Sequence, residues 1–271
     1  MFCYFEPSME ARLDARRSLE TDLRKALAND EFELFFQPQV DLRLYEINGF
    51  EALLRWRHPK WAKVSPAEYI PVAEDIGLIS PLGEWVIRTA CAEAVKWPRD
   101  IKVAVNLSPV QFRNGTLVQS VRHALESTGL APRRLELEIT ETSLLDENEA
   151  TMAALHELRR LGVQIAIDDF GTGYSSLSYL RSFPFDRIKV DRSFVRDLSS
   201  RRDAMTIVQS IASLGAGLGM STVAEGIETK EQLTQVQTAG YTEAQGYYFG
   251  RPKPAHELVY SLDALLSAPS A

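Results

Sequence analysis

The stretch Gln164-Ile165-Ala166-Ile167-Asp168-Asp169 is a short apolar run that ends in two adjacent carboxylates. Runs that end at an acid, an amide or a lysine recur at a fairly even spacing at Phe50–Leu53, Val103–Asn106, Leu137–Glu141, Ile188–Asp191, Thr222–Glu225 and Ala244–Gly246. Continuous runs of Val, Ile and Leu are typical of buried parallel strands. In a (β/α)8 barrel the carboxyl ends of such strands converge on one site. The sequence therefore predicts an α/β protein with polar side chains gathered at one end of a barrel.

Two expected strands at Phe32–Val40 and Ile47–Trp56 begin the pattern. The segment Asp41–Tyr45 between them is too short for a crossover helix, so we expect the two strands to be antiparallel neighbours. Strands and helices then alternate, with Ser65 and Ser80 as N-caps and further helices expected at 111–128, 147–161, 175–181, 202–218, 230–238 and 255–266. A strand count near eight predicts a closed (β/α)8 TIM-like barrel with an antiparallel first strand.

The first 30 residues differ in character from the rest of the chain. Phe2–Phe5 is a strand candidate without an evident sheet, and a charged helical stretch follows in which Leu19, Leu23 and Ala26 lie near a 3.6-residue period. We interpret residues 1–30 as a linker strand and helix from an upstream domain, residues 31–262 as the barrel and residues 263–271 as a C-terminal tail.

Composition narrows the class of protein. The chain has 271 residues, 45% of them hydrophobic, and a formal net charge of −7. An acidic chain is poorly suited to binding along a nucleic-acid backbone, so we expect no duplex nucleic acid as partner. Cys3 and Cys91 are too few for a disulfide framework, and we find neither a signal peptide nor an apolar stretch of about 18 residues. We therefore expect no membrane span in this chain and a cytoplasmic location.

Several acids that face one point repel each other, so cations must hold them together. Of the adjacent pair Asp168 and Asp169, at least one must face the barrel mouth, where a carboxylate can bridge two cations about 3.5–4 Å apart. The alternative is a solvated turn. Glu138 and Glu141 flank the end of another strand, where a simple helix cap is the alternative. Glu225 adds an inward acid, with Glu228 expected to support it.

Two basic residues also share faces with carboxylates. With a period of 2, Glu51 and Arg55 point to the same side of their strand, either as a core salt bridge or as a metal ligand beside a phosphate-binding arginine. Lys189 and Asp191 share a face in the same way. Nearby acids should keep Lys189 protonated, so that it binds a metal-held water or accepts its proton once metals neutralise the acids; an ion pair with Asp191 is the alternative. Gln245 is neutral and suits orienting water or substrate.

Taken together, these motifs resemble those of the EAL-domain cyclic di-GMP phosphodiesterases over about residues 31 to 262. The resemblance rests on Glu51-Ala52-Leu53 with Arg55, Asn106, Glu138 with Glu141, Asp168-Asp169-Phe170-Gly171-Thr172-Gly173, Lys189 with Asp191, Glu225 with Glu228, and Gln245-Gly246-Tyr247. Each motif is weak alone, but the ordered set is highly specific.

The resemblance implies roles for individual residues. One Mg²⁺ or Mn²⁺ would be held by Glu51, Asn106, Glu138 and Asp168, and a second by Asp168, Asp169 and Glu225. Lys189 and Gln245 would contact the attacking water and, with Glu51 and Glu225, form the catalytic set. The substrate would contact Gln37, Leu53, Arg55 and Asp191. The loop and the second metal site would be supported by Glu141, Glu228, Phe170, Gly171 and Gly173.

The implied activity is metal-dependent hydrolysis of cyclic di-GMP to linear pGpG. The family likeness further implies a homodimer, and Phe5–Met9 resembles the exit from a diguanylate cyclase (GGDEF) domain, which implies upstream GGDEF and sensory domains. Two other functions stay open. One is a receptor that binds cyclic di-GMP without turnover, and the other is a lyase or aldolase that uses a metal and a Lys189 Schiff base.

Overall fold

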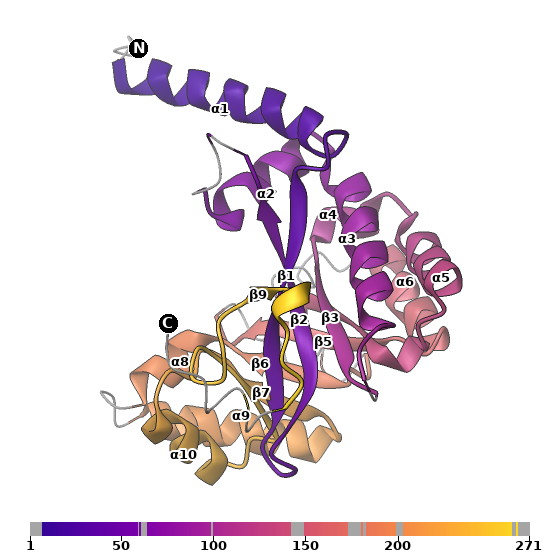
Figure 1. Cartoon of the computed structure of the whole chain (residues 1–271). Helices are drawn as coiled ribbons and strands as arrows, with labels where there is room; N and C mark the ends of the chain where they lie inside the picture. Colours follow the sequence, from indigo (N-terminus) through magenta and orange to yellow (C-terminus); the bar gives the residue numbers. More distant parts are fainter. Residues whose placement is uncertain are drawn as a thin grey trace.

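The computed structural model describes residues 7–58, 60, 64–98, 100–141, 149–172, 180, 183–198, 203–261 and 264, with side chains from residue 14 onward. Its centre is a closed barrel in which the strands follow the order β2-β3-β4-β5-β6-β7-β8-β1, with β1 pairing back to β2 and a short β9 added to β1 (Figure 1). The strands are β1 Phe32–Asp41, β2 Glu46–Trp56, β3 Lys102–Leu107, β4 Leu135–Thr140, β5 Gln164–Phe170, β6 Arg187–Val190, β7 Ser221–Ala224, β8 Glu243–Gln245 and β9 Lys253–Pro254.

Strand β1 is antiparallel to both of its barrel neighbours, β2 and β8, whereas the neighbours from β2 through β8 are parallel. The predicted barrel with an antiparallel first strand is therefore confirmed. Helices surround it: α1 Pro7–Ala26, α2 Pro66–Asp75, α3 Ile79–Ala94, α4 Pro109–Arg113, α5 Leu117–Thr128, α6 Glu149–Arg160, α8 Arg192–Asp197, α9 Ala204–Leu218, α10 Lys230–Thr238, and the 3₁₀ turns η1 Pro132–Arg134 and η3 Ala255–Glu257.

Three helix predictions need correction, and one helix was missed. The expected helix 111–128 is two helices, because Gly115 takes a left-handed conformation with φ 66° between them. Ser80 is not an N-cap: α3 starts one residue earlier, directly after the turn in which the Leu78 N–H bonds to the Ala73 carbonyl at the end of α2. Of the expected helix 255–266, residues 255–257 form a 3₁₀ turn and the chain becomes extended at Leu258; Ala264 is helical, and residues 262–263 and 265–266 lie outside the described residues. Helix α8 was not predicted.

Two other predictions, for α2 and α10, are confirmed, and three concern segments that lie largely outside the described residues. Ser65 forms a capping box with Glu68 at the start of α2, as expected. Helix α10 has its predicted bounds. The expected strand Phe2–Phe5 and nearly all of the expected helix 175–181 and the tail 263–271 lie outside the described residues.

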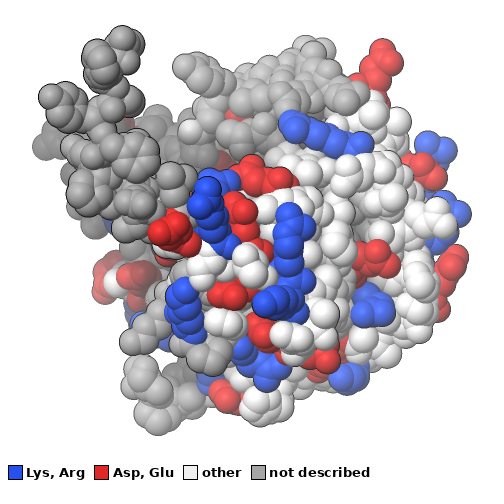
Figure 2. All heavy atoms as spheres, turned by 90° about the horizontal axis from the view of Figure 1, so that it is seen from above, with Lys and Arg blue, Asp and Glu red and all other residues white. Residues whose placement is uncertain are grey.

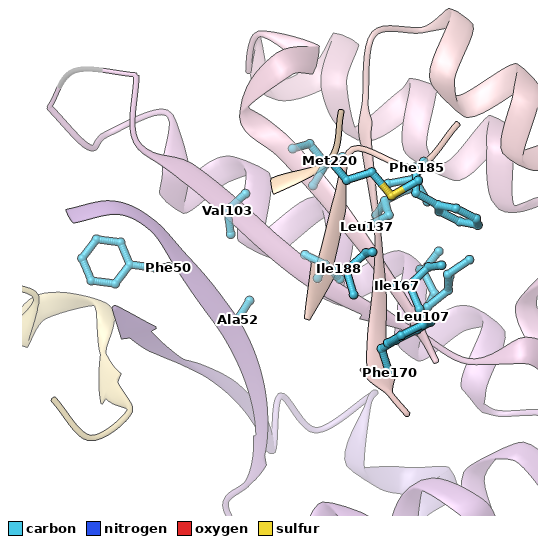
Figure 3. Close-up of a cluster of buried hydrophobic side chains, with 14 of the residues drawn as sticks. Phe50, Ala52, Val103, Leu107, Leu137, Ile167, Phe170, Phe185, Ile188 and Met220 are labelled. Atoms are coloured by element: carbon cyan, nitrogen blue, oxygen red, sulfur yellow. The ribbon is translucent and has the colours of Figure 1, made fainter. Parts of the chain in front are cut away.

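The barrel has an apolar outside and a polar inside. Side chains on the outer face, such as Val103, Leu137, Ile167 and Ile188, pack with Met220 and Phe185 beneath the helices (Figure 3). On β4, Glu136 and Glu138 alternate with the apolar residues and point into the barrel, where they pair with Arg187 and Lys189 of β6. All but the last residue of β4 are buried. Alternate side chains on this strand therefore face either the apolar layer under the helices or the polar inside of the barrel, and neither face is exposed to solvent.

Helix α1 packs on α2 and on the barrel end. Leu19, Leu23 and Ala26 are buried in a cluster with Trp56 and Tyr69, as the helical period predicted. Among the described residues, no helix combines the length and the apolar character needed to cross a membrane. Seen from above, Lys and Arg side chains are interspersed with Asp and Glu over the described part of that face (Figure 2). The surface in this view is therefore mixed in charge.

Candidate active site

The chemistry-bearing side chains come from successive strands and meet at the carboxyl end of the barrel. Glu51 lies on β2, Asn106 on β3, Glu138 on β4, Asp168 on β5 and Lys189 on β6. Glu225 follows β7, and Gln245 ends β8. A cleft of about 190 Å³ opens above them, lined by Gln37, Glu51, Leu53, Asp168, Arg192, Glu225, Gly226, Glu228, Gln245, Gly246 and Tyr247.

Lys189 is the centre of this arrangement. Its ammonium group is fully buried, and Nζ lies 2.8 Å from Glu138, 3.2 Å from Asp168, 2.7 Å from Glu225 and 3.9 Å from Glu51. Burial alone would lower the pKa of Lys189, but these carboxylates outweigh burial and raise its pKa well above the ordinary value. Lys189 therefore stays charged. Its partners are these four acids, whereas Asp191 caps helix α8 by accepting a hydrogen bond from the Ser193 N–H at 3.0 Å.

Hydrogen bonds hold Glu51 at both oxygens. Oε1 accepts from Asn106 Nδ2 at 2.6 Å, and Oε2 accepts from Gln245 Nε2. Gln245 Nε2 also donates to Gln37 Oε1 at 3.2 Å. Glu51 is thus positioned by two amides, Asn106 on β3 and Gln245 on β8, as well as by Lys189.

Asp168, Asp169 and Glu225 form the group that best suits a metal ion, because each places a carboxylate oxygen within 4.8 Å of the others. Burial, together with the charges of Asp168 and Asp191, raises the pKa of Asp169 to about 6. Burial also raises the pKa of Glu225 to about 8, with further contributions from Asp168 and Glu51 that Lys189 only partly offsets. One ammonium group therefore leaves negative charge uncompensated at the mouth. Hard divalent cations prefer such oxygen ligands, so the donor set fits Mg²⁺ or Mn²⁺.

Backbone strain fixes the direction of Asp169. Its φ is +53°, a left-handed conformation that costs a non-glycine residue about 1–2 kcal/mol. Thr172 stabilises the turn, because its N–H and its hydroxyl both donate to the Asp169 carbonyl, at 3.2 and 2.8 Å. The turn lets Asp168 and Asp169, although adjacent in sequence, both contribute to the acidic group.

Residues 20–252 match the family model described as the EAL domain. The chain belongs to the EAL-domain family. It is 42% identical over 265 residues to the bifunctional diguanylate cyclase/cyclic di-GMP phosphodiesterase MucR of Pseudomonas aeruginosa, covering 96% of this chain and 39% of MucR. It is also 42% identical to the cyclic di-GMP phosphodiesterase NbdA of the same species, covering 93% of this chain and 33% of NbdA.

A solved structure of the MucR phosphodiesterase from Pseudomonas aeruginosa, in complex with c-di-GMP, superimposes with a TM-score of 0.85 at 41% identity. The match covers 89% of this chain and 100% of that chain. The chain thus spans about a third to two-fifths of the length of these curated relatives but the whole of the solved domain.

The loop after β5 of this EAL domain is tied to the end of β4. Glu141 Oε2 accepts a hydrogen bond from the Gly171 N–H at 2.9 Å, which joins two predicted loop-supporting residues. Gly171 has φ +94°, and a Cβ there would lie 2.9 Å from the Phe194 ring, so only glycine suits this position. Phe170 packs in the core, and Gly173 lies outside the described residues. Glu228 lines the cleft, while its N–H donates to Gln232 on α10.

The substrate-binding predictions divide into two groups. Gln37 and Leu53 line the cleft. Arg55 does not: its guanidinium lies over the Phe35 ring, 5.5 Å from the centroid, and donates to the Leu54 carbonyl. Although the structure describes both residues, no ion pair joins Arg55 to Glu51, so the alternative of a core salt bridge is wrong.

Sequence reasoning missed two sets of residues in this EAL domain. Arg192, the first residue of α8, and the half-exposed Tyr247, in the turn after β8, line the cleft, and no periodic pattern indicates that they do so. Arg187, Glu136 and Glu243 form a second buried charged layer deeper in the barrel. A signal for that layer was present, because Arg187 and Glu136 each lie two residues before a predicted site residue on the same strand face.

Proposed function

We propose that this EAL domain hydrolyses one phosphodiester bond of cyclic di-GMP and releases linear pGpG, using two divalent cations, Mg²⁺ or Mn²⁺. The observation that carries the proposal is the group of Asp168, Asp169 and Glu225 around the buried Lys189 at the carboxyl end of the barrel. The names of the relatives MucR and NbdA support the same reaction class.

The residues suited to hold the cations fall into two overlapping sets. In the proposal one cation is held by Glu51, Asn106, Glu138 and Asp168, and the other by Asp168, Asp169 and Glu225. When bound, the pair would lower the pKa of a water molecule and stabilise negative charge on the phosphate.

Side chains of the protein itself would orient the water and the substrate by donating hydrogen bonds. Without cations, the carboxylates around Lys189 raise its pKa, so that it donates hydrogen bonds in its charged form. Gln245 presents its amide N–H to Glu51 and Gln37, which suits holding an oxygen atom of water or substrate beside Glu51. Gln37 and Leu53 would contact the nucleotide within the cleft, whereas Arg55 and Asp191, which do not line the cleft, would contact the substrate outside it. Leu53 also supplies apolar lining for a base or ribose.

The two rival functions are less well supported. A receptor that only binds the nucleotide needs few of the carboxylates gathered around Lys189. A Schiff-base lyase requires a neutral amine, and the pKa of Lys189 is raised rather than lowered.

The test is a turnover assay with matched variants. The purified chain is incubated with cyclic di-GMP and Mn²⁺ or Mg²⁺, and the products are separated by chromatography. We expect linear pGpG from the native chain, none with EDTA, and a loss of roughly 100-fold or more in Asp168→Asn. Asp100→Asn removes a charge from an exposed surface pair and should leave turnover unchanged. Cyclic di-GMP that binds but is recovered intact with both cations would replace the proposal by the receptor function.

The wider organisation is also a proposal. We retain residues 1–30 as a linker from upstream GGDEF and sensory domains, 31–262 as the barrel and 263–271 as a tail. The double name of MucR, of which this chain covers 39%, supports a cyclase domain upstream. We propose a homodimer in solution, and light scattering that gives the mass of a single 30.4 kDa chain at micromolar concentration would refute it.

A further inference from the structure

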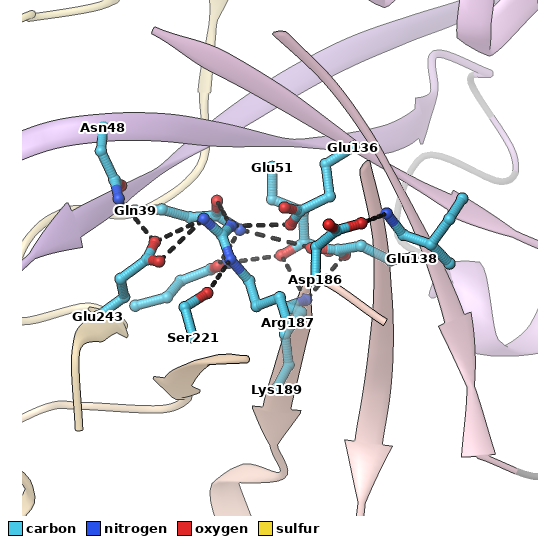
Figure 4. A network of polar contacts seen from close by, with 12 residues as sticks. Gln39, Asn48, Glu51, Glu136, Glu138, Asp186, Arg187, Lys189, Ser221 and Glu243 are labelled. Atoms are coloured by element: carbon cyan, nitrogen blue, oxygen red, sulfur yellow. Dashed lines mark hydrogen bonds and ion pairs between the residues drawn. The ribbon is translucent and has the colours of Figure 1, made fainter. Parts of the chain in front are cut away.

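A buried charged layer lies beneath the candidate active site. Arg187 is 2% exposed, and its guanidinium contacts Glu136 at 2.8 Å and Glu243 at 2.7 Å (Figure 4). Arg187 Nε also donates to Ser221 Oγ at 3.2 Å. This layer is separate from the carboxylates around Lys189, and neither the proposed hydrolysis nor its cations require it directly.

Gln39 connects the two layers. Its Oε1 accepts a hydrogen bond from Arg187 Nη1 at 3.2 Å. A guanidinium has donors and no acceptor, so the Gln39 amide must turn its oxygen toward Arg187 and its NH₂ group toward the mouth. There Gln39 Nε2 donates to Gln245 Oε1 at 3.1 Å and lies 3.5 Å from Glu138 Oε1.

The same reasoning fixes the next amide. Because Gln245 Oε1 is occupied by Gln39, Gln245 must direct its NH₂ group to Glu51 Oε2 and Gln37 Oε1. Gln39 is 1% exposed, so no solvent water competes for its amide. The chain of donors thus runs in one direction, from Arg187 through Gln39 and Gln245 to Glu51.

We propose that Gln39 is a positioning residue that sets the amide orientation of Gln245, and thereby makes Gln245 a donor toward Glu51 and the reacting groups. The inference deepens the proposed hydrolysis and rests on it for its kinetic effect. If the Gln245 amide were reversed, its oxygen would face the Glu51 carboxylate, and the hydrogen bond would become a repulsion.

The main variant is Gln39→Met, which keeps the volume and removes both amide groups. We expect kcat for cyclic di-GMP to fall roughly 10- to 100-fold, as for other residues that orient metal ligands, with KM within about threefold of the native value. Ser221→Ala is the matched control, because it removes a hydrogen bond from Arg187 without touching Gln39. It should leave kcat within about twofold of native.

A second variant covers the case in which Gln39→Met does not fold. In Gly49→Ala the new Cβ would lie 2.9 Å from Gln39 Oε1, so the amide must shift while all of its atoms remain. We expect kcat to fall roughly 3- to 10-fold with KM unchanged. Native kcat in either folded variant, or an equal loss in Ser221→Ala, would overturn the proposal.

A measurement without turnover separates this inference from the proposed function. In ¹⁵N-labelled chain, with the Gln245 side-chain amide assigned by Gln245→Met, its protons should exchange with solvent at least about tenfold faster in Gln39→Met than in native or Ser221→Ala chain. If the native chain released no pGpG, the proposed function would fall, and this exchange rate would still decide the positioning role. Equal rates in all three chains would refute it.

Discussion

Glu225 should make the metal-free domain less stable as the pH rises. Its folded-state pKa of about 8 lies above the ordinary 4.5, so the folded state keeps a proton that the unfolded state loses between these values. The contribution of Glu225 to the free energy of unfolding is therefore fully present below pH 4.5, and it is lost as the pH rises through 8. One pKa unit corresponds to about 1.4 kcal/mol, which gives about 5 kcal/mol for the full difference. Because 18% of the side chain is exposed, solvent screens part of this, and we expect about 3 kcal/mol.

The assay is urea unfolding followed by tryptophan fluorescence, in EDTA, at pH values from 5 to 8.5. The free energy of unfolding of the native chain should fall by about 3 kcal/mol more over this range than that of Glu225→Gln, which cannot ionise. Glu136 and Glu138, whose pKa values burial also raises, are common to both chains and cancel in the comparison. Parallel pH dependences in the two chains would show that Glu225 is not held in an unfavourable charged environment.

Three further predictions concern the same site. Mn²⁺ added to EDTA-treated chain should raise the free energy of unfolding by about 3 kcal/mol at a hundredfold excess over its dissociation constant, and more at pH 8 than at pH 6; no gain in a thermal melt would contradict a cation site. Lys189→Met should abolish turnover and cost about 3–5 kcal/mol in urea unfolding, because it leaves carboxylates without their counterion; a cost below 1 kcal/mol would argue against that role. Gly246→Ala should destabilise the fold by about 1–3 kcal/mol and lower kcat, because its Cβ would overlap the Ile227 backbone. Gly217→Ala, in open space on α9, should instead stabilise by about 0.5–1 kcal/mol, and equal effects of the two would refute the steric argument.

The barrel could be predicted because its strands carry a strong local signal. Apolar runs that end in a polar residue mark both the strand and its carboxyl end, and the short link at Asp41–Tyr45 was enough to make the first strand antiparallel. Parallel alignment of these ends then places Glu51, Glu138 and Asp168 together without further information. Hence the metal-suited residues were the easiest part of the site to find.

The parts that could not be predicted depend on contacts between distant segments. Arg192 reaches the cleft from the start of helix α8, which was not predicted, and Tyr247 reaches it from the loop after β8, where no period restricts direction. Arg55 shares a strand face with Glu51, yet it lies beyond the interior and stacks on Phe35, a contact set by pairing with β1. The break between α4 and α5 arises from the left-handed Gly115, which apolar periodicity alone does not reveal.

Inside this barrel the excess of negative over positive charge increases toward the open end, and this increase follows from strand geometry. Strand β6 places Arg187 and Lys189 on the inner face two residues apart, and β4 places Glu136 and Glu138 opposite them. In the lower layer one guanidinium meets two carboxylates, whereas in the upper layer one ammonium meets four. Hence the excess negative charge is concentrated at the open end, where cations and substrate have access. The better-compensated layer beneath supplies a fixed base from which amides can orient the carboxylates above.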